Sequence, residues 1–247
     1  MTPLAPDPAS LRGLRLFSGL DAAALAEIVR SAHTRRIEKG TTIFSQGDRA
    51  ALCHALIDGR VKIVQTGADG QQLVVRYIGA GEMFGTAAVF SGGIYPADAF
   101  AMVDCVGVHW SAATMGELME RYPRIALNAL DIVGRRLQEV QTRLRELSTE
   151  RVERRVAHAL LRLVRQAGRR VGNGVEIDFP LSRQDIAEMT GTTLHTVSRI
   201  LSGWEGQGIV EGGRQQVTIR QPHALVAIAE DLPKPEKTAT PAKPDGK

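Results

Sequence analysis

The sequence predicts an α+β chain in which an N-terminal β-roll is followed by a long dimerisation helix and a C-terminal winged helix-turn-helix. Three observations predict this order. Turn signals recur at even intervals in the first half, with short apolar runs between them, at Gly47, Gly59, Gly70 and Gly81. Apolar residues then recur every three or four positions through residues 126–147. Finally, two short helical patterns meet at a glycine within residues 181–201.

The composition indicates a soluble, cytoplasmic protein of two domains. The chain has 247 residues, 43% of them hydrophobic and 23% charged, and a formal net charge of +4, which permits a nucleic-acid partner without requiring one. Cys53 and Cys105 lie far apart in the sequence and form no metal-binding pair, so we expect both thiols to be reduced. We expect no signal peptide and no membrane partner, because no apolar run approaches about 20 residues.

The first predicted domain, residues 1–113, is the sensor roll. Residues 1–13 hold three prolines and are expected to form a loose arm. Asp21 can cap a helix that runs to about Ala32. About eight short strands should then follow between Ile37 and Trp110.

The second region, residues 114–148, is predicted to be helical and to carry the dimer interface. A short helix over Glu117–Arg121 should stop at Tyr122-Pro123, and a second should run from Pro123 to about Ser148. Its seam has spacings of three and four, which fits a narrow parallel dimer stripe better than the alternative, a helix lying on its own roll. The predicted interface comprises Leu130, Val133, Leu137, Val140, Leu144 and Leu147.

The third region, residues 149–231, should hold the winged helix-turn-helix, before a Pro/Lys-rich tail at 232–247 that we expect to be disordered. Helix is predicted to continue over Ser148–Gly168, with a strand over Val175–Phe179 and a last helix over Pro222–Glu230.

The helix-turn-helix pattern carries the functional prediction. Ser182 can cap the first helix, Gly191 provides the turn, and Thr192 or Thr193 can cap the second helix. Apolar runs at Ile209-Val210 and Val217–Ile219 flank a Gly-rich turn at 211–214, which predicts a hairpin wing. Short helices joined at glycine also occur in proteins that never touch DNA, but the added wing favours duplex DNA as the partner. The predicted DNA-binding residues are Arg183, Thr192, Thr193, Leu194, His195, Ser198 and Arg199.

Several local motifs, taken together, resemble the Crp/Fnr superfamily of bacterial transcription regulators. They span about Leu16 to Glu230 and read LFSGL, KG–IF–QGD, DGRVKI, GEMFG and TVSRIL. The resemblance implies a cyclic-nucleotide-binding-like roll, a homodimer, a recognition helix in the major groove of a palindromic site, RNA polymerase as a partner, and transcription activation. Arg199 corresponds to the family arginine that contacts guanine, and Ser198 beside it implies a TTG…CAA-like site. His195 stands where the family usually has glutamate, which changes the hydrogen bonding offered to that base.

The resemblance also bears on the effector. Cyclic-nucleotide binders of the family have glutamate and arginine where this chain has Thr86 and Pro96. A buried phosphate would therefore lack a charge partner, so we do not expect cyclic AMP. No cysteine precedes Cys53, so an iron–sulfur cluster is not expected either. The nitric-oxide-responsive branch fits best, with haem as a possible cofactor and His33 and His54 as candidate ligands against ordinary histidines. The predicted effector pocket comprises Met83, Phe84, Gly85, Thr86, Val89 and Phe90.

Two other functions compete with this interpretation. An enzyme on a cupin-like barrel needs a close histidine pair with a carboxylate, and His33, His54, His109 and His158 show no such pair in the sequence. We therefore expect no enzymatic activity. The alternative is a ligand-binding regulatory module whose winged helix contacts protein. That module would show no salt-dependent affinity for duplex DNA.

Overall fold

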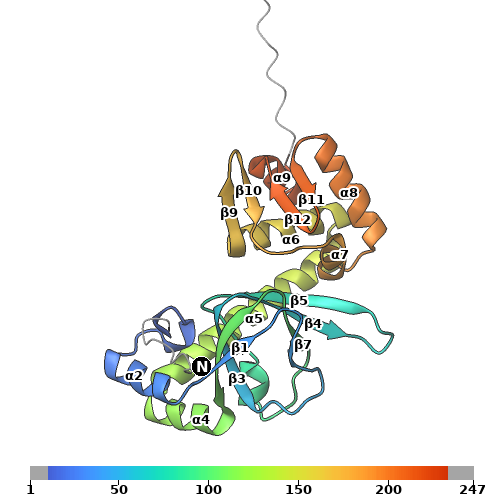
Figure 1. Ribbon diagram of the computed structural model, residues 1–247. Coiled ribbons are helices and arrows are strands. Elements are labelled where there is room, and N and C mark those ends of the chain that lie inside the picture. Colours follow the sequence, from blue (N-terminus) through green and yellow to red (C-terminus); the bar gives the residue numbers. More distant parts are fainter. Residues whose placement is uncertain (1–10, 233–247) are drawn as a thin grey trace, which may run out of the picture.

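The computed structural model describes residues 11–232, and these form a β-roll, a long helix and a C-terminal winged domain in that order (Figure 1). Most of the predicted loose arm, and the predicted disordered tail apart from residue 232, lie outside the described residues. The end of the arm is not loose, because Leu11 and Leu14 are fully buried in the roll's core. A 3-10 turn, η1 (Arg15–Phe17), and helix α2 (Ala22–Arg30) follow. Asp21 caps α2 as predicted, and the helix ends two residues before Ala32.

The roll contains eight strands, as many as expected, in two four-stranded sheets ordered β1-β8-β3-β6 and β2-β7-β4-β5, but the first strand begins at His33, four residues before the predicted start at Ile37. Apolar side chains that include Leu56, Val61 and Ile78 fill the space between the sheets. A short helix, α3 (Thr86–Phe90), follows β6. The strands are β1 (His33–Ile37), β2 (Thr42–Phe44), β3 (Leu52–Asp58), β4 (Arg60–Thr66), β5 (Gln72–Gly79), β6 (Met83–Phe84), β7 (Asp98–Ala101) and β8 (Cys105–Ser111).

The helical region differs from the prediction at two points. Helix α4 (Ala112–Arg121) begins five residues before Glu117, because the Ser111 side chain accepts a hydrogen bond from the Thr114 amide and caps it. Helix α5 (Pro123–Thr149) matches the prediction closely. The expected continuation through Gly168 is wrong, because Glu150 has an extended backbone and a new helix, α6 (Val152–Ala167), starts after it.

A tertiary contact explains this break. The Glu150 side chain is only 4% exposed, and its Oε2 lies 3.3 Å from Nε2 of His158 on α6. The Glu146 carboxylate accepts two hydrogen bonds of 2.8 Å from Arg162, also on α6. These pairs stabilise the change of direction, whereas the local residue pattern would have continued the helix.

The winged domain has a four-stranded sheet in the order β11-β12-β10-β9. Strand β9 begins at Gly168, the last residue of the predicted helix, and was not predicted, and β10 ends at Ile177 rather than at Phe179. The wing turn lies on Arg214 and Gln215 rather than on the glycines, and Gln215 takes a positive φ of 59°. The elements are β9 (Gly168–Val171), β10 (Gly174–Ile177), α7 (Arg183–Thr190), α8 (Leu194–Gly206), β11 (Val210–Gly213), β12 (Gln216–Ile219) and α9 (Pro222–Ala229).

The winged domain packs against the β4–β5 side of the roll, with α7 next to β5 (Figure 1). The rings of Tyr77 on β5 and Phe179 have centroids 4.6 Å apart. Lys62 Nζ on β4 lies 2.8 Å from Asp185 Oδ1 on α7. The start of the helix-turn-helix is therefore bonded directly to the roll. The domain boundaries at residues 113, 148 and 231 stay predictions.

Candidate nucleic-acid interface

Helix α7 begins in a reciprocal cap. The Ser182 hydroxyl accepts a hydrogen bond from the Asp185 amide at 3.0 Å. The Asp185 carboxylate in turn accepts one from the Ser182 amide, also at 3.0 Å. This arrangement satisfies two of the N–H groups that a helix start leaves without partners. The same carboxylate binds Lys62, so the cap and the contact with the roll share one side chain.

The turn between α7 and α8 forms as predicted. Gly191 takes a left-handed conformation with φ of 60°, and Thr193 caps α8 by accepting from the Thr196 amide. Of the inward positions, Val197 and Leu201 are buried and Ile200 is half-buried. These side chains hold α8 in one rotation about its axis, which determines the residues that it presents to solvent.

The outward side of α8 is the predicted recognition face. Leu194, His195 and Arg199 are exposed, and Ser198 is half-buried. His195 and Arg199 lie one helical turn apart and project side by side. Of the two cap residues, Thr193 is exposed and Thr192 half-buried. The structure thus brings six of the seven predicted DNA-binding residues onto the first two turns of α8 and the residues just before it.

Arg183 differs from the other predicted DNA-binding residues, because it is engaged within the protein. It is the first residue of α7, and its Nη2 lies 3.0 Å from Glu205 Oε1 near the end of α8. Arg214 was missed by the sequence argument. It is exposed in the wing turn, where a basic residue between two strands of a winged helix is the signal that could have identified it.

The α5 seam is exposed to solvent over its whole length. Leu130 is 69% exposed and Leu144 63% exposed, whereas Ile125 and Ala129 on another side of the helix are buried. The alternative of a helix lying seam-down on its own roll is therefore wrong. The remaining predicted interface residues, all at least 46% exposed, are Val133, Leu137, Val140 and Leu147.

The predicted effector residues do not form one apolar wall. Phe84 and Val89 are buried, Met83 and Thr86 are half-buried, and Phe90 is 38% exposed. A Cβ placed on Gly85 would lie 3.2 Å from the Tyr95 ring, which stacks on Phe44 with centroids 3.9 Å apart.

Three histidines that lie far apart in the sequence are neighbours in the roll, although no carboxylate joins them in a group that could hold a metal ion within the described residues. His33 pairs with His109 across β1 and β8, and His109 pairs with His54 across β8 and β3. The ring centroids are 5.5 Å and 6.0 Å apart. Burial, with the nearby charges of His109 and Arg35, lowers the pKa of His54 to about 4. Burial also lowers the pKa of His109.

Within residues 11–232, no group of three or more histidine, cysteine or acidic side chains could hold a metal ion. No helix in the same range is long and apolar enough to cross a membrane.

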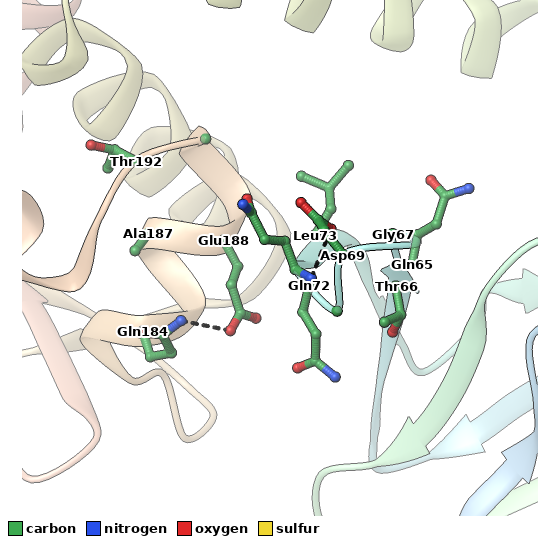
Figure 2. Close-up of a pocket in the computed structure, with 13 residues that line it drawn as sticks. Gln65, Thr66, Gly67, Asp69, Gln72, Leu73, Gln184, Ala187, Glu188 and Thr192 are labelled. Atoms are coloured by element: carbon green, nitrogen blue, oxygen red, sulfur yellow. Dashed lines mark hydrogen bonds between the residues drawn. The ribbon is translucent and has the colours of Figure 1, made fainter.

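A cleft of about 710 Å³ separates the β4–β5 connection from α7 (Figure 2). Figure 2 shows Asp69 and Gln72 on one side and Gln184 and Glu188 on the other. Gln184 donates to Glu188 at 2.9 Å, and both residues line the cleft, so its α7 wall is polar.

Comparisons with known proteins agree with this architecture. Residues 34–122 match the family model of the cyclic nucleotide-binding domain, and residues 154–228 match that of the Crp-like helix-turn-helix domain. The chain is 32% identical over 223 residues to the cyclic AMP receptor protein of Thermus thermophilus, which covers 90% of this chain and 100% of that protein.

Two solved structures are similar as well. The catabolite activator protein of Thermus thermophilus has a TM-score of 0.52 and 30% identity, and the match covers 89% of this chain and all of that one. FixK2 from Bradyrhizobium japonicum has a TM-score of 0.70 over 80% of this chain and 96% of that one. At 24% identity, the second match supports the fold alone.

Proposed function

Because the chain belongs to the Crp/Fnr family of transcription regulators, we propose that it binds a palindromic, TTG…CAA-like duplex site as a homodimer. The observation that carries the proposal is the α8 surface, where Arg199 and His195 project together from a helix fixed by its cap and its buried side. Arginine reads guanine through two acceptors in the major groove, and such pairs discriminate against other bases.

The roles of the other residues follow from their positions. Thr192, Thr193 and Leu194 lie at the start of α8, where backbone amides and hydroxyls can meet a phosphate. Ser198 lies beside Arg199, and Arg183 lies at the start of α7, which crosses the DNA backbone in helix-turn-helix complexes. RNA polymerase is the expected protein partner, with activation as the expected outcome.

A duplex titration at several salt concentrations tests the proposal. Arg199→Ala should weaken binding to a TTG…CAA palindrome by about 1–3 kcal/mol and affect a random duplex much less. Equal losses on both duplexes would contradict the role given to Arg199. If the wild-type protein has no salt-dependent affinity for any duplex, the winged helix contacts protein instead.

The homodimer is proposed from the exposed seam of α5. Leu137 is 57% exposed in the single chain, within a continuous apolar stripe whose burial by a second copy would be favourable. Leu137→Asp should make the protein monomeric at micromolar concentration in light scattering, because an unpaired carboxylate would enter the stripe. Ile94→Asp is the matched control, since Ile94 is 60% exposed on the roll.

For the effector, we propose a small molecule other than cyclic AMP. The Thermus thermophilus relative is named for cyclic AMP, but this chain has Thr86 and Pro96 at the family's acid and arginine positions, and the Tyr95 ring packs against Gly85. A ligand that binds only the folded protein raises its Tm. Cyclic AMP at millimolar concentration should therefore leave the Tm unchanged, and a rise of several degrees would contradict the proposal.

Haem, the candidate for a nitric-oxide response, does not fit His54. The His54 ring is buried, stacks on Phe84 with centroids 5.1 Å apart, and lies 3.4 Å from the position of a Cβ on Gly85. His33 is exposed on the edge strand β1 and is the remaining candidate ligand. Haem reconstitution of wild type and His33→Ala tests it, and identical spectra would eliminate His33.

A further inference from the structure

An ion pair joins the two helices of the helix-turn-helix next to the wing. Arg183 Nη2 at the start of α7 lies 3.0 Å from Glu205 Oε1 near the end of α8. Gly212 on β11 lies directly over this pair, because a Cβ there would clash with Glu205 Oε1 and lie 3.8 Å from Arg183 Nη2. The Glu205 carboxylate therefore occupies a gap that exists only because residue 212 has no side chain.

The pair lies at the surface that we assign to DNA. The side chains of Arg183 and Glu205 are 38% and 31% exposed, so solvent and a ligand can reach them. Carboxylate and phosphate oxygens form the same charge-assisted hydrogen bonds with a guanidinium group. The start of the first helix is also where the DNA backbone passes in helix-turn-helix complexes. Glu205 thus binds Arg183 in the way that a backbone phosphate would.

We propose that Glu205 is an internal competitor for the DNA phosphate at Arg183. The inference rests on the proposed DNA binding. While the pair is intact, its two charges cancel, and Arg183 adds little to the attraction between protein and DNA. Phosphate contacts carry no sequence information, so the competition lowers the affinity for every duplex by a similar factor. Base reading by Arg199 on α8 is unaffected.

Glu205→Gln tests the competition through the salt dependence of binding. The variant should bind the palindrome and a random duplex several-fold more tightly, and the slope of log K against log salt should steepen by about 0.9, the value for one added phosphate contact. Glu176→Gln is the matched control. It removes the same single negative charge at the opposite edge of the winged-domain sheet, where Arg169 pairs with Glu176 at 3.1 Å and also with Asp178 at 3.2 Å, and it should change the slope much less.

Gly212→Ala tests the same competition without changing any charge. Gly212 is not among the glycines with positive φ, so alanine can adopt its backbone conformation. The added methyl group would clash with the far end of the Glu205 side chain, while Arg183 Nη2 lies at an ordinary contact distance of 3.8 Å, so it should push the Glu205 carboxylate away from Arg183. We expect the same steeper salt slope as in Glu205→Gln.

A double-mutant cycle with Arg183→Ala separates competition from a general charge effect. In the Arg183→Ala background, Glu205→Gln should no longer steepen the slope. An equal gain in both backgrounds would overturn the proposal, as would weaker binding by Glu205→Gln alone. If the wild type binds duplex DNA but neither Glu205→Gln nor Gly212→Ala changes the slope, only this inference fails. If the wild type binds no duplex at all, the proposed function fails with it.

Discussion

Buried side-chain polar atoms are all hydrogen-bonded in the segment 168–232, whereas some in the rest of the described residues are not. In the former, the Asp185 carboxylate binds the Ser182 amide, the Ser182 hydroxyl and Lys62, and the Thr190 hydroxyl donates to the Ile186 carbonyl at 2.7 Å. Within that described segment, no buried side-chain nitrogen or oxygen lacks a hydrogen-bond partner. In the roll and at the α5–α6 junction, four such atoms have neither a hydrogen bond nor an ion pair: Thr34 Oγ1, Arg60 Nε, Tyr77 OH and Arg162 Nε. Glu150 Oε2 has no hydrogen bond, but it lies 3.3 Å from Nε2 of His158.

This difference indicates which parts of the chain can change arrangement. A buried polar group without a partner costs about 1–3 kcal/mol, so a second arrangement that satisfies it recovers a similar amount toward the cost of repacking. The helix-turn-helix has no unbonded buried group, so a second arrangement would recover no such cost. We therefore expect it to move as a unit, while the roll and the junction at Glu150 repack when the effector binds.

The largest expected effect concerns the buried imidazole of the roll. Burial lowers the pKa of His54 from 6.5 to about 4 in the folded protein. Above pH 6.5 the His54 imidazole is therefore mostly neutral in both the folded and the unfolded protein. As the pH falls from 6.5 to 4, His54 takes up a proton only in the unfolded protein, so the free energy of unfolding falls by about 3 kcal/mol. The lowered pKa of His109 acts in the same direction. Urea unfolding at pH 7.5 and 4.5 measures the loss.

His54→Gln is the control variant for this pH effect. It removes the titrating group at the position that packs against Phe84, so its stability should fall less between the two pH values than that of the wild type. The same pH dependence in both proteins would show that acid acts on groups other than His54.

A smaller effect is expected at the well-bonded start of α7. Ser182→Ala removes the hydroxyl that accepts from the Asp185 amide, and loss of a helix cap costs about 1 kcal/mol. Ser182→Gly keeps the turn and lets water reach the amide, so it should lose only a few tenths of that amount. Thermal unfolding compares the two variants, and equal losses would argue against the cap.

The residues that could be predicted from sequence are those fixed by local signals. Ser182, Gly191 and Thr193 act on amides within a few positions of themselves, so the helix-turn-helix and its exposed α8 face followed from the sequence. The proximity of His33, His109 and His54 could not be predicted, because it depends on the register of three strands that are distant in the chain. The break at Glu150 and the Glu205–Arg183 pair likewise depend on contacts between separate elements.

The smallest expected effect compares two tyrosines of the roll. The Tyr77 hydroxyl is buried without a partner, while its ring packs on Phe179. Tyr77→Phe keeps the ring and removes the unbonded hydroxyl, so the free energy of unfolding should stay the same or rise slightly. The Tyr95 hydroxyl donates to the Leu52 carbonyl at 2.7 Å, so Tyr95→Phe should cost about 1 kcal/mol. Denaturant titration measures both variants. If Tyr77→Phe lost as much as Tyr95→Phe, the Tyr77 hydroxyl would have a partner in solution, and the roll would be as fully bonded there as the helix-turn-helix.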